Sequence, residues 1–293
     1  MSISVQEGSL PPDLSGAQFA RVAAIARAEA GLCLPEGKRH MISSRLARRL
    51  KDTGHGDLAS YIAFLETHGS QGERRKLVTA LTTNVSHFFR EAHHFRILES
   101  DILPPLIERA RAGGRVRIWS AGCSTGQEPF SIAMILLSAF PEAGRHDIRI
   151  LASDIDEAVL ETARRGTYAE RLLQDVGDAL RRQFFTAEGD DFTVCDRLRA
   201  LVTFRRLNLI GDWPIKGRFD AIFCRNVVIY FDAATQAALW PRFHRLLEPG
   251  GVLFVGHSER LDTESARAFV SAGVTTWRRA ADPEPRRPNQ GSR

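Results

Sequence analysis

A turn of small residues between two apolar segments is the first place where this chain could bind a ligand. The segment 115–131 starts with the strand-like alternation Val116-Arg117-Ile118-Trp119 and continues into the small residues 120–126. An apolar helical run, 130–136, follows. A strand, turn and helix of this kind bring backbone N–H groups close to a nucleotide, because small residues let the ligand approach. Gly122 is therefore a candidate binding residue, although a tight turn without a ligand has the same pattern.

An acidic residue stands at the end of the next predicted strand. The run 148–153 is apolar enough for a buried strand, and Asp154 follows it. In nucleotide-binding sheets an acid at this place accepts hydrogen bonds from both ribose hydroxyls. The alternative is that Asp154 caps the helix beginning near Asp156. The glycine spacing differs from Gly-x-Gly-x-x-Gly, which argues against a nicotinamide oxidoreductase.

Further strands alternate with helical segments and predict an α/β fold. Phe219–Cys224 and Gly251–Gly256 are apolar strand-like runs, and Val274–Arg278 would add an antiparallel edge strand. Such alternation is typical of a parallel, doubly wound sheet. Between Gly166 and Leu207 the alternation is interrupted by a helical stretch and short strand-like runs. We expect an α/β domain over 115–280 with a small inserted β-subdomain at 166–206.

The N-terminal part has helical periodicity. Ser15 with Gln18 forms a capping-box pattern, and an apolar stripe from Phe19 ends at Gly31. Three more apolar stripes predict a helical domain over 1–80, followed by junction helices over 81–114. The Pro- and Arg-rich residues 281–293 are expected to be a disordered tail.

The second predicted helix carries a basic face. Lys38, Arg45, Arg48 and Arg49 lie on one side of a helical wheel, and no acid occurs between Lys38 and Lys51. A solvated surface is one explanation, and an acidic partner is the other. The net charge of +5 fits an acidic partner without identifying it.

Composition limits the classes of protein. The four cysteines form no Cys-x-x-Cys pair, which favours buried thiols in a reducing compartment. The start has no signal-peptide plan, and no apolar run is long enough to insert into a membrane. We therefore expect a cytoplasmic protein. His87, His93 and His94 are poorly arranged to share an ion on one helix, so no metal is expected.

Five segments share their order and spacing with one known family. They are Thr82-Thr83-Asn84 with Phe88-Phe89-Arg90-Glu91, then 119–129, 152–156, 207–209 and 224–232. Together they resemble the chemotaxis receptor methyltransferases of the CheR type over nearly the whole chain. The resemblance implies a Rossmann-like domain dependent on S-adenosylmethionine, which becomes S-adenosylhomocysteine. It also implies a monomer that methylates glutamate side chains in the cytoplasmic helical domain of methyl-accepting chemotaxis receptors.

The resemblance also implies roles for individual residues. Arg90 and Tyr230 would take part in methyl transfer, and the basic face of the second helix would bind the receptor. Gln127 stands where many relatives have a second glutamate and Ser86 where some have threonine, and both keep a hydrogen-bonding side chain. A short loop at 188–191 argues against docking of a receptor's C-terminal pentapeptide. The cofactor-binding residues would be Asn84, Ser86, Arg90, Gly122, Glu128, Asp154, Asn208, Leu209, Arg225 and Asn226.

Two alternatives share the expected fold. A nucleic-acid methyltransferase would also be basic, but such amino-methylating enzymes carry an Asn/Asp-Pro-Pro-aromatic element where this chain has Arg225-Asn226-Val227-Val228. A non-catalytic module that senses S-adenosylmethionine is the other alternative, and the presence of Arg90 and Tyr230 favours catalysis over it.

Overall fold

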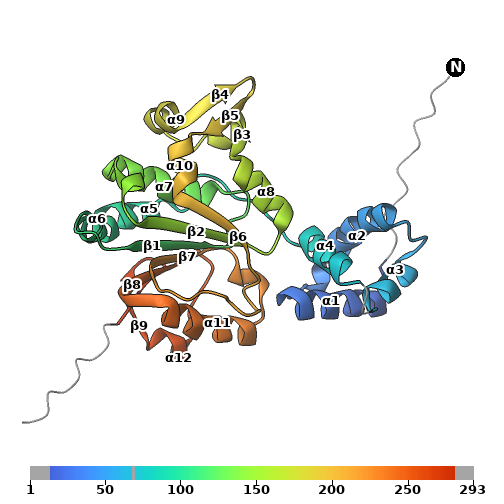
Figure 1. Cartoon of the computed structure of the whole chain (residues 1–293). Coiled ribbons are helices and arrows are strands. Elements are labelled where there is room, and N and C mark those ends of the chain that lie inside the picture. Colours follow the sequence, from blue (N-terminus) through green and yellow to red (C-terminus); the bar gives the residue numbers. More distant parts are fainter. Residues whose placement is uncertain (1–13, 68–69, 281–293) are drawn as a thin grey trace, which may run out of the picture.

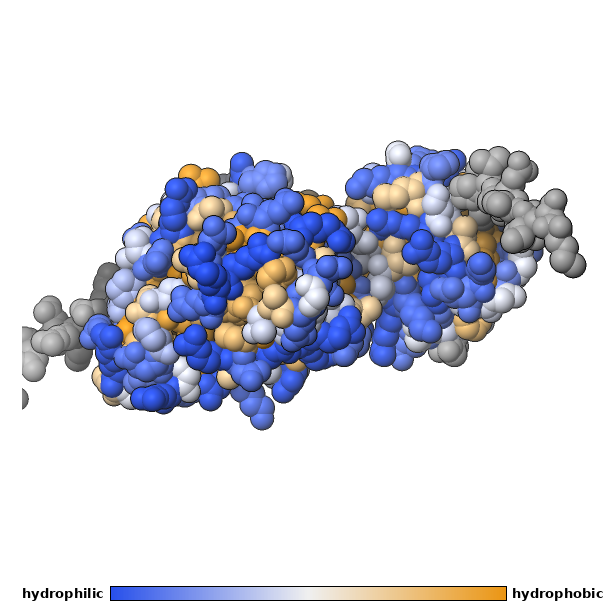
Figure 2. All heavy atoms as spheres, turned by 90° about the horizontal axis from the view of Figure 1, so that it is seen from above, coloured by the Kyte–Doolittle hydropathy of each residue, from blue (hydrophilic) through white to orange (hydrophobic). Residues whose placement is uncertain are grey.

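Four helices form a separate body at the N-terminal end of the chain, at the right of Figure 1. They are α1 (Gly16–Ala30), α2 (Arg39–Thr53), α3 (Leu58–Leu65) and α4 (Gln71–Leu81), with a 3-10 turn, η1 (Glu36–Lys38), before α2. The computed structural model describes residues 14–67 and 70–280, so the expected tail at 281–293 lies outside it. Seen from above, the surface narrows between this helical body and the rest of the molecule (Figure 2).

Helix α1 is set by its caps, as its sequence predicts. The Ser15 hydroxyl accepts from the Gln18 N–H while the Gln18 side chain accepts from the Ser15 N–H. At the other end Gly31 has φ 69°, and its N–H bonds the carbonyls of Ala26 and Arg27. A left-handed glycine ends a helix at little cost. The chain therefore turns at Gly31 towards the larger domain.

Two residues of the predicted basic face hold the helical body together. Arg49 donates to both carboxylate oxygens of Glu73, with contacts of 2.7–2.9 Å, and the Tyr61 hydroxyl donates to the same carboxylate at 2.8 Å. Arg45 donates to the last carbonyls of α4, including those of Leu81 at 2.8 Å and Thr82 at 2.9 Å. Lys38 and Arg48 are exposed. Periodicity places side chains on one face of a helix but does not show what packs there.

The segment predicted as junction helices contains a long, almost continuous helix that packs in the core of the larger domain, on the side away from the helical body (Figure 1). It consists of α5 (Ala92–Ile97), a π-helical segment η3 (Leu98–Ile102) and α6 (Leu103–Arg111). The sequence predicts that the helix ends at Pro104-Pro105, and this is wrong. Both prolines stand in the first turn of α6, where the missing N–H costs least.

A seven-stranded sheet forms the larger domain, which confirms the α/β prediction. Its order is β6-β2-β1-β7-β8-β10-β9, with parallel pairing from β6 to β8 and antiparallel pairing of β10 with β8 and β9. The edge strand is therefore β9 rather than the predicted segment, which is β10. The strands are β1 (Val116–Ala121), β2 (Ile148–Asp154), β6 (Val202–Arg206), β7 (Phe219–Cys224), β8 (Leu247–Val255), β9 (Phe269–Gly273) and β10 (Thr276–Arg279).

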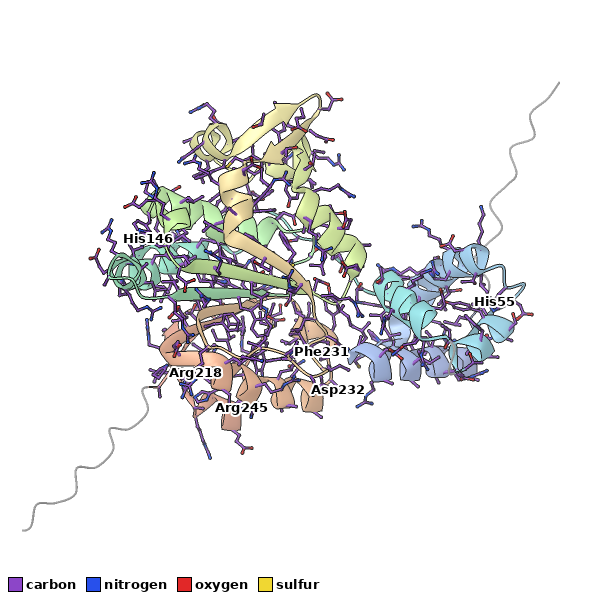
Figure 3. The ribbon with its side chains drawn as sticks, viewed as in Figure 1. His55, His146, Arg218, Phe231, Asp232 and Arg245 are labelled. Carbon is purple, nitrogen blue, oxygen red and sulfur yellow. The ribbon has the colours of Figure 1, made fainter. Side chains whose placement is uncertain are left out.

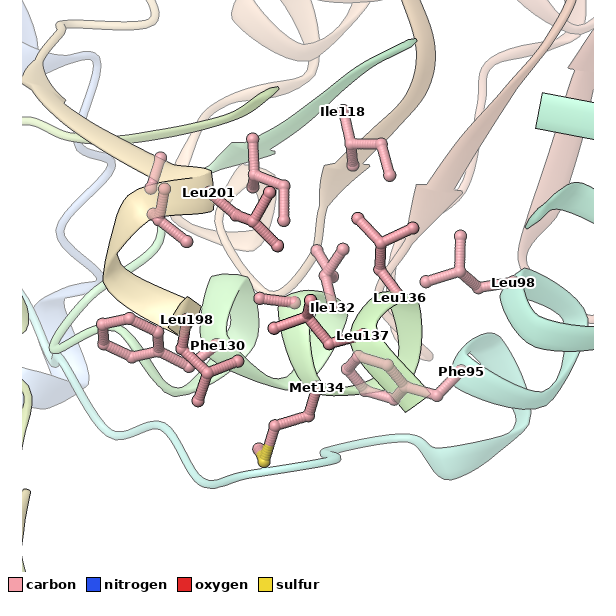
Figure 4. Close-up of a cluster of buried hydrophobic side chains, with 14 of the residues drawn as sticks. Phe95, Leu98, Ile118, Phe130, Ile132, Met134, Leu136, Leu137, Leu198 and Leu201 are labelled. Atoms are coloured by element: carbon pink, nitrogen blue, oxygen red, sulfur yellow. The ribbon is translucent and has the colours of Figure 1, made fainter. Parts of the chain in front are cut away.

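Helices cover both faces of this sheet. On one side the apolar side chains of α7, among them Ile132 and Leu136, pack with Leu198 and Leu201 from the region of α10 (Figure 4). On the other side α11 packs in a second core that continues into the helical body. The helices are α7 (Gln127–Ala139), α8 (Glu157–Arg165), α10 (Asp196–Leu201), α11 (Ala233–Leu246) and α12 (Thr263–Ala266), with short 3-10 turns η4 (Ala143–Arg145) and η6 (Val228–Tyr230).

The inserted subdomain is shorter than predicted. A small sheet of order β3-β5-β4 contains β3 (Thr167–Ala169), β4 (Phe185–Glu188) and β5 (Asp191–Val194), with η5 (Glu170–Leu173) and α9 (Asp178–Phe184) between them. The predicted range 166–206 is wrong at its end, because 202–206 form β6 and pair with β2 in the main sheet. A short apolar run predicts a strand without showing which sheet it joins.

The two bodies are joined by contacts between the end of α1 and the loop after η6. Leu32 and Phe231 form an antiparallel bridge, and the Cys33 N–H donates to the Tyr230 carbonyl at 2.7 Å. Asp232, next to Phe231, forms an ion pair with Arg27 of α1. Figure 3 labels Phe231 and Asp232, which lie beside the helical body. In the part of the chain described, no helix is long and apolar enough to cross a membrane.

The Arg49–Glu73 pair gives a test of this packing. Replacing Arg49 by Met leaves the nearly buried Glu73 carboxylate without its cation, so we expect a loss of about 3 kcal/mol in the free energy of unfolding. The control is Arg48→Met, one residue away and exposed, which should change stability by less than about 0.5 kcal/mol. Urea denaturation followed by circular dichroism measures both. Equal midpoints for the two variants would contradict a structural role for Arg49.

Candidate functional site

A pocket lies where the carboxyl ends of β1, β2 and β7 meet the helical body. Its wall includes Ala30 and Leu32 at the end of α1, which the sequence gave no reason to place there. All eleven residues predicted to bind the cofactor or take part in transfer line it: Asn84, Ser86, Arg90, Gly122, Glu128, Asp154, Asn208, Leu209, Arg225, Asn226 and Tyr230. The structure thus brings residues from five separate segments of the chain to one cavity.

Gly122 allows two loops to approach each other closely. Its φ is +88°, and a Cβ at this position would lie 2.3 Å from a methyl group of Val227, in the loop after β7. The N–H groups of Gly122 and Cys123 both donate to the Ser153 carbonyl, at 2.8 and 2.9 Å. These two donors are therefore used within the protein, and the glycine serves the packing of the pocket wall.

Asp154 is not the helix cap that was its alternative. The cap of α8 is Asp156, which accepts from the Ala158 N–H at 2.9 Å. Asp154 accepts from the N–H groups of Ser124 at 2.9 Å and Asp156 at 3.0 Å while still lining the pocket. Burial raises the pKa of Asp154, although both hydrogen bonds oppose that shift. The carboxylate is thus held in a fixed orientation at the end of β2.

A buried ion pair in the wall of the pocket joins four elements. Arg225 Nε donates to Glu128 Oε2 at 2.8 Å, and the Ser120 hydroxyl donates to Glu128 Oε1 at 2.6 Å. Arg225 Nη1 also donates to the Arg90 carbonyl at 2.6 Å and to His94 Nδ1 at 3.0 Å. Both charged side chains are at least nine-tenths buried, with exposures of 2% and 9%. Buried charges are stable only when they are paired and hydrogen-bonded, and here each side chain has its counter-ion and at least one further hydrogen bond.

His94 is a functional neighbour that the sequence did not identify. Since its Nδ1 accepts from Arg225, the other ring nitrogen carries the proton and donates to Thr275 Oγ1 at 2.9 Å. Burial, followed by the charge of Arg225, lowers the pKa of His94 to about 3. The sequence raised His94 only as a metal ligand, a role that its position next to His93 argued against, because sequence shows adjacency and not hydrogen-bond partners.

The ligand atoms of Glu91, His93 and His94 do lie within 4.8 Å of one another. Both ring nitrogens of His94 are already engaged, and one faces the Arg225 guanidinium at 3.0 Å. A cation bound there would be repelled by this guanidinium, and only two ligands would remain for it. The cluster is therefore explained by its role in the buried network.

Strained backbone surrounds the pocket. Among the described residues, five other than glycine have positive φ, and four of them lie on segments that line the cavity: Phe89 (53°), Glu91 (58°), Ser124 (50°) and Asn226 (58°). Such conformations cost about 1–3 kcal/mol each and persist where the surroundings enforce them. Their gathering at one cavity is typical of a functional site.

Arg90 and Tyr230 line the pocket, are partly exposed, and have weak internal contacts. Arg90 donates to the Val85 carbonyl at 3.2 Å and forms no ion pair with another described residue. The Tyr230 hydroxyl lies 3.5 Å from the Thr83 carbonyl, at the limit of a hydrogen bond. A cationic guanidinium and a phenol are thus available to an acidic group entering the pocket.

The lowered pKa of His94 predicts a pH dependence of stability. Between pH of about 3 and 6.5 the unfolded histidine binds a proton that the folded one does not, so stability falls as pH is lowered through this window. The contribution is up to about 1.4 kcal/mol per pH unit. We expect His94→Gln to flatten this decline in urea titrations at pH 6.5 to 4, whereas the exposed control His40→Gln should not. Parallel curves for His94→Gln and the parent would rule out a buried neutral His94.

Comparison with known proteins agrees with this geometry. Residues 84–277 match the family described as CheR methyltransferase, SAM binding domain, and residues 17–82 match CheR methyltransferase, all-alpha domain. A probable chemotaxis protein methyltransferase of Rhizobium etli is 46% identical, covering 85% of this chain and 95% of that protein. The chemotaxis protein methyltransferase of Escherichia coli K12 is 41% identical, covering 92% of this chain and 93% of that protein.

A third relative, chemotaxis protein methyltransferase 2 of Pseudomonas aeruginosa, is 42% identical over 84% of this chain and 87% of that protein. The resemblance stated from five motifs is therefore confirmed, together with the fold and the cofactor that it implied. The two family models match the helical body and the α/β domain, and the relatives are covered over most of their length. The chain therefore belongs to the CheR methyltransferase family and is an S-adenosylmethionine-dependent methyltransferase.

Proposed function

We propose that this enzyme methylates glutamate side chains in the cytoplasmic helical domain of methyl-accepting chemotaxis receptors, forming glutamyl methyl esters. The observation that carries the proposal is the cation of Arg90, which forms no ion pair with another described residue and lines the same pocket as the Tyr230 hydroxyl. Relatives named chemotaxis protein methyltransferases support it. The motif at 225–228 lacks the prolines of amino-methylating nucleic-acid enzymes, which argues against that substrate class.

The site needs no general base for this reaction. When bound, S-adenosylmethionine supplies an electrophilic methyl group on a sulfonium. A glutamate has an ordinary pKa of about 4.3, so its carboxylate is already the nucleophile near neutral pH. We propose that Arg90 orients this carboxylate, that the Tyr230 hydroxyl hydrogen-bonds it, and that Asp154 holds the cofactor's ribose. Orientation and partial removal of water then supply the rate enhancement.

A basic groove beside the pocket fits an acidic receptor helix. It runs between α2, α4 and the start of α8, and Thr82 and Ile155 line both the groove and the pocket. Arg48, Arg75, Lys76 and Arg206 line the groove, are exposed, and form no ion pair with another described residue.

The acids of the groove have partners of their own. Asp52 pairs with Arg49, Glu157 pairs with Arg164, and Asp156 accepts from Ala158 and Asn84. The groove therefore keeps a net positive charge. From the predicted basic face, Arg48 supplies a free charge here, while Arg45 and Arg49 also line the groove but are engaged internally.

Methylation of a receptor fragment tests the proposed function. The protein is incubated with methyl-labelled S-adenosylmethionine and the cytoplasmic fragment of a chemoreceptor, and the labelled product is then treated with mild base. We expect release of the label, because a methyl ester hydrolyses under these conditions and an N-methyl group does not. A base-stable label, or label found on added nucleic acid instead, would refute the proposal.

Tyr230→Phe is expected to separate turnover from cofactor binding. The hydroxyl is proposed to act on the acceptor carboxylate, so its loss should lower kcat by roughly tenfold, the effect of one hydrogen bond to a charged group. The affinity for S-adenosylmethionine, measured by calorimetry, should stay within about twofold. Unchanged turnover would remove Tyr230 from the reaction.

Reversal of charge in the groove is expected to weaken receptor binding. Each exposed contact contributes about 0.2–1 kcal/mol, so Arg48→Glu with Lys76→Glu should raise the KM for the receptor fragment about tenfold at low salt and less at high salt. The control is Arg145→Glu with Arg218→Glu, an equal change of charge away from the groove; Figure 3 labels Arg218 and also His146, the neighbour of Arg145, far from the helical body. An equal rise in KM for the control would show that only net charge matters.

A further inference from the structure

One buried carboxylate has no part in any motif and no cationic partner among the described residues. Glu259 lies shortly after β8 and is 3% exposed. It does not line the pocket. A buried charge without a counter-ion is costly unless hydrogen bonds replace the lost water. The hydrogen-bond partners of the Glu259 carboxylate therefore indicate its role.

The partners of Glu259 are four consecutive backbone N–H groups of the loop after β7. Its Oε1 accepts from Val227 at 2.8 Å, Val228 at 2.9 Å and Ile229 at 3.3 Å. Its Oε2 accepts from Asn226 at 2.9 Å and also from Gly256. The loop therefore takes its shape by wrapping around one side chain, and it is this loop that carries Arg225, Asn226 and Tyr230 into the pocket.

Two neighbouring features make this arrangement specific. A Cβ on Gly256 would lie 2.7 Å from the Asn226 nitrogen and 2.9 Å from Glu259 Oε2, so only glycine lets the two segments meet. On the pocket side Glu91 accepts from the Asn226 side chain at 3.3 Å and the His257 N–H at 3.2 Å. Asn226 is thus held in its left-handed conformation, with φ 58°, from both sides.

We propose that Glu259 is a positioning residue for methyl transfer: it shapes the loop 226–229 and thereby sets where Tyr230 presents its hydroxyl. It touches neither substrate nor cofactor and acts only through the loop. The role of Tyr230 rests on the proposed function, whereas the shaping of the loop does not.

A double-mutant cycle with Tyr230 tests this role. Glu259→Gln keeps the size of the side chain but turns an amide NH₂ towards backbone donors, so the loop should lose its set shape. We expect kcat to fall by about tenfold or more with a smaller change in cofactor affinity. In the Tyr230→Phe background the same change should lower kcat by less than about threefold, because its effect passes through the hydroxyl that is already missing.

The matched control is Asp262→Asn. Asp262 also accepts from two backbone N–H groups, those of Glu264 and Ser265, but it caps α12 and does not contact the loop. Its kcat should equal that of the parent. A folded Glu259→Gln protein with parental kcat, or one whose loss is undiminished in the Tyr230→Phe background, would overturn the proposal. If Glu259→Gln fails to fold, Glu259→Asp, which keeps the charge, is carried through the same cycle.

Hydrogen exchange separates this proposal from the proposed function. In the parent the amides of 226–229 should be protected, and in the Glu259 variant they should exchange at least about tenfold faster, while those of α7 stay unchanged. This measurement needs no receptor. Absence of receptor methylation by the parent would refute the proposed function, whereas equal exchange in both proteins would refute the positioning role.

Discussion

The structure of the site depends on the buried pair of Glu128 and Arg225. Removing two charges from water costs several kcal/mol per ion, and here further hydrogen bonds from neighbouring residues support both side chains. The Ser120 hydroxyl of β1 donates to Glu128, while the Arg90 carbonyl and His94 Nδ1 accept from Arg225. The pair thus connects the sheet, its first crossover helix α7 and helix α5. Each of these elements is held at a fixed distance from the others because none can move without exposing a charge.

The cofactor pocket is a property of two bodies rather than of the α/β domain alone. The end of α1 supplies part of the wall, and the Glu29 carbonyl accepts from the side chain of Asn208 at 2.8 Å. Contacts between the Cys33 N–H and the Tyr230 carbonyl continue this seam. The helical body therefore closes the pocket as well as lying beside the basic groove, so the proposed substrate docking would use the same helices that enclose the pocket.

The sequence predicts the role of a residue where a local pattern defines it, and fails where a distant partner defines it. The turn at Gly122 and the acid at Asp154 follow local patterns with a known geometry, and the motifs supplied the other predicted site residues, but not Ala30 and Leu32 at the end of α1. Arg49 was grouped correctly on a helix face, but its partner Glu73 is distant in the chain. Likewise β6 was recognised as a strand and assigned to the wrong sheet. Glu259 gave no signal and His94 was considered only as a metal ligand, because single buried polar residues are defined by partners that only the tertiary structure brings together.

The contact between Gly122 and Val227 has an evolutionary consequence. Any side chain at position 122 would overlap the Val227 methyl group, because its Cβ would lie only 2.3 Å away. The backbone of Gly122 also has a positive φ, a conformation that other residues adopt only with strain. Substitution at Gly122 is therefore conditional: it becomes tolerable only after position 227 has become smaller, and even then at the cost of backbone strain. Divergent members of the family that have lost the glycine at position 122 should therefore also carry a residue smaller than valine at position 227.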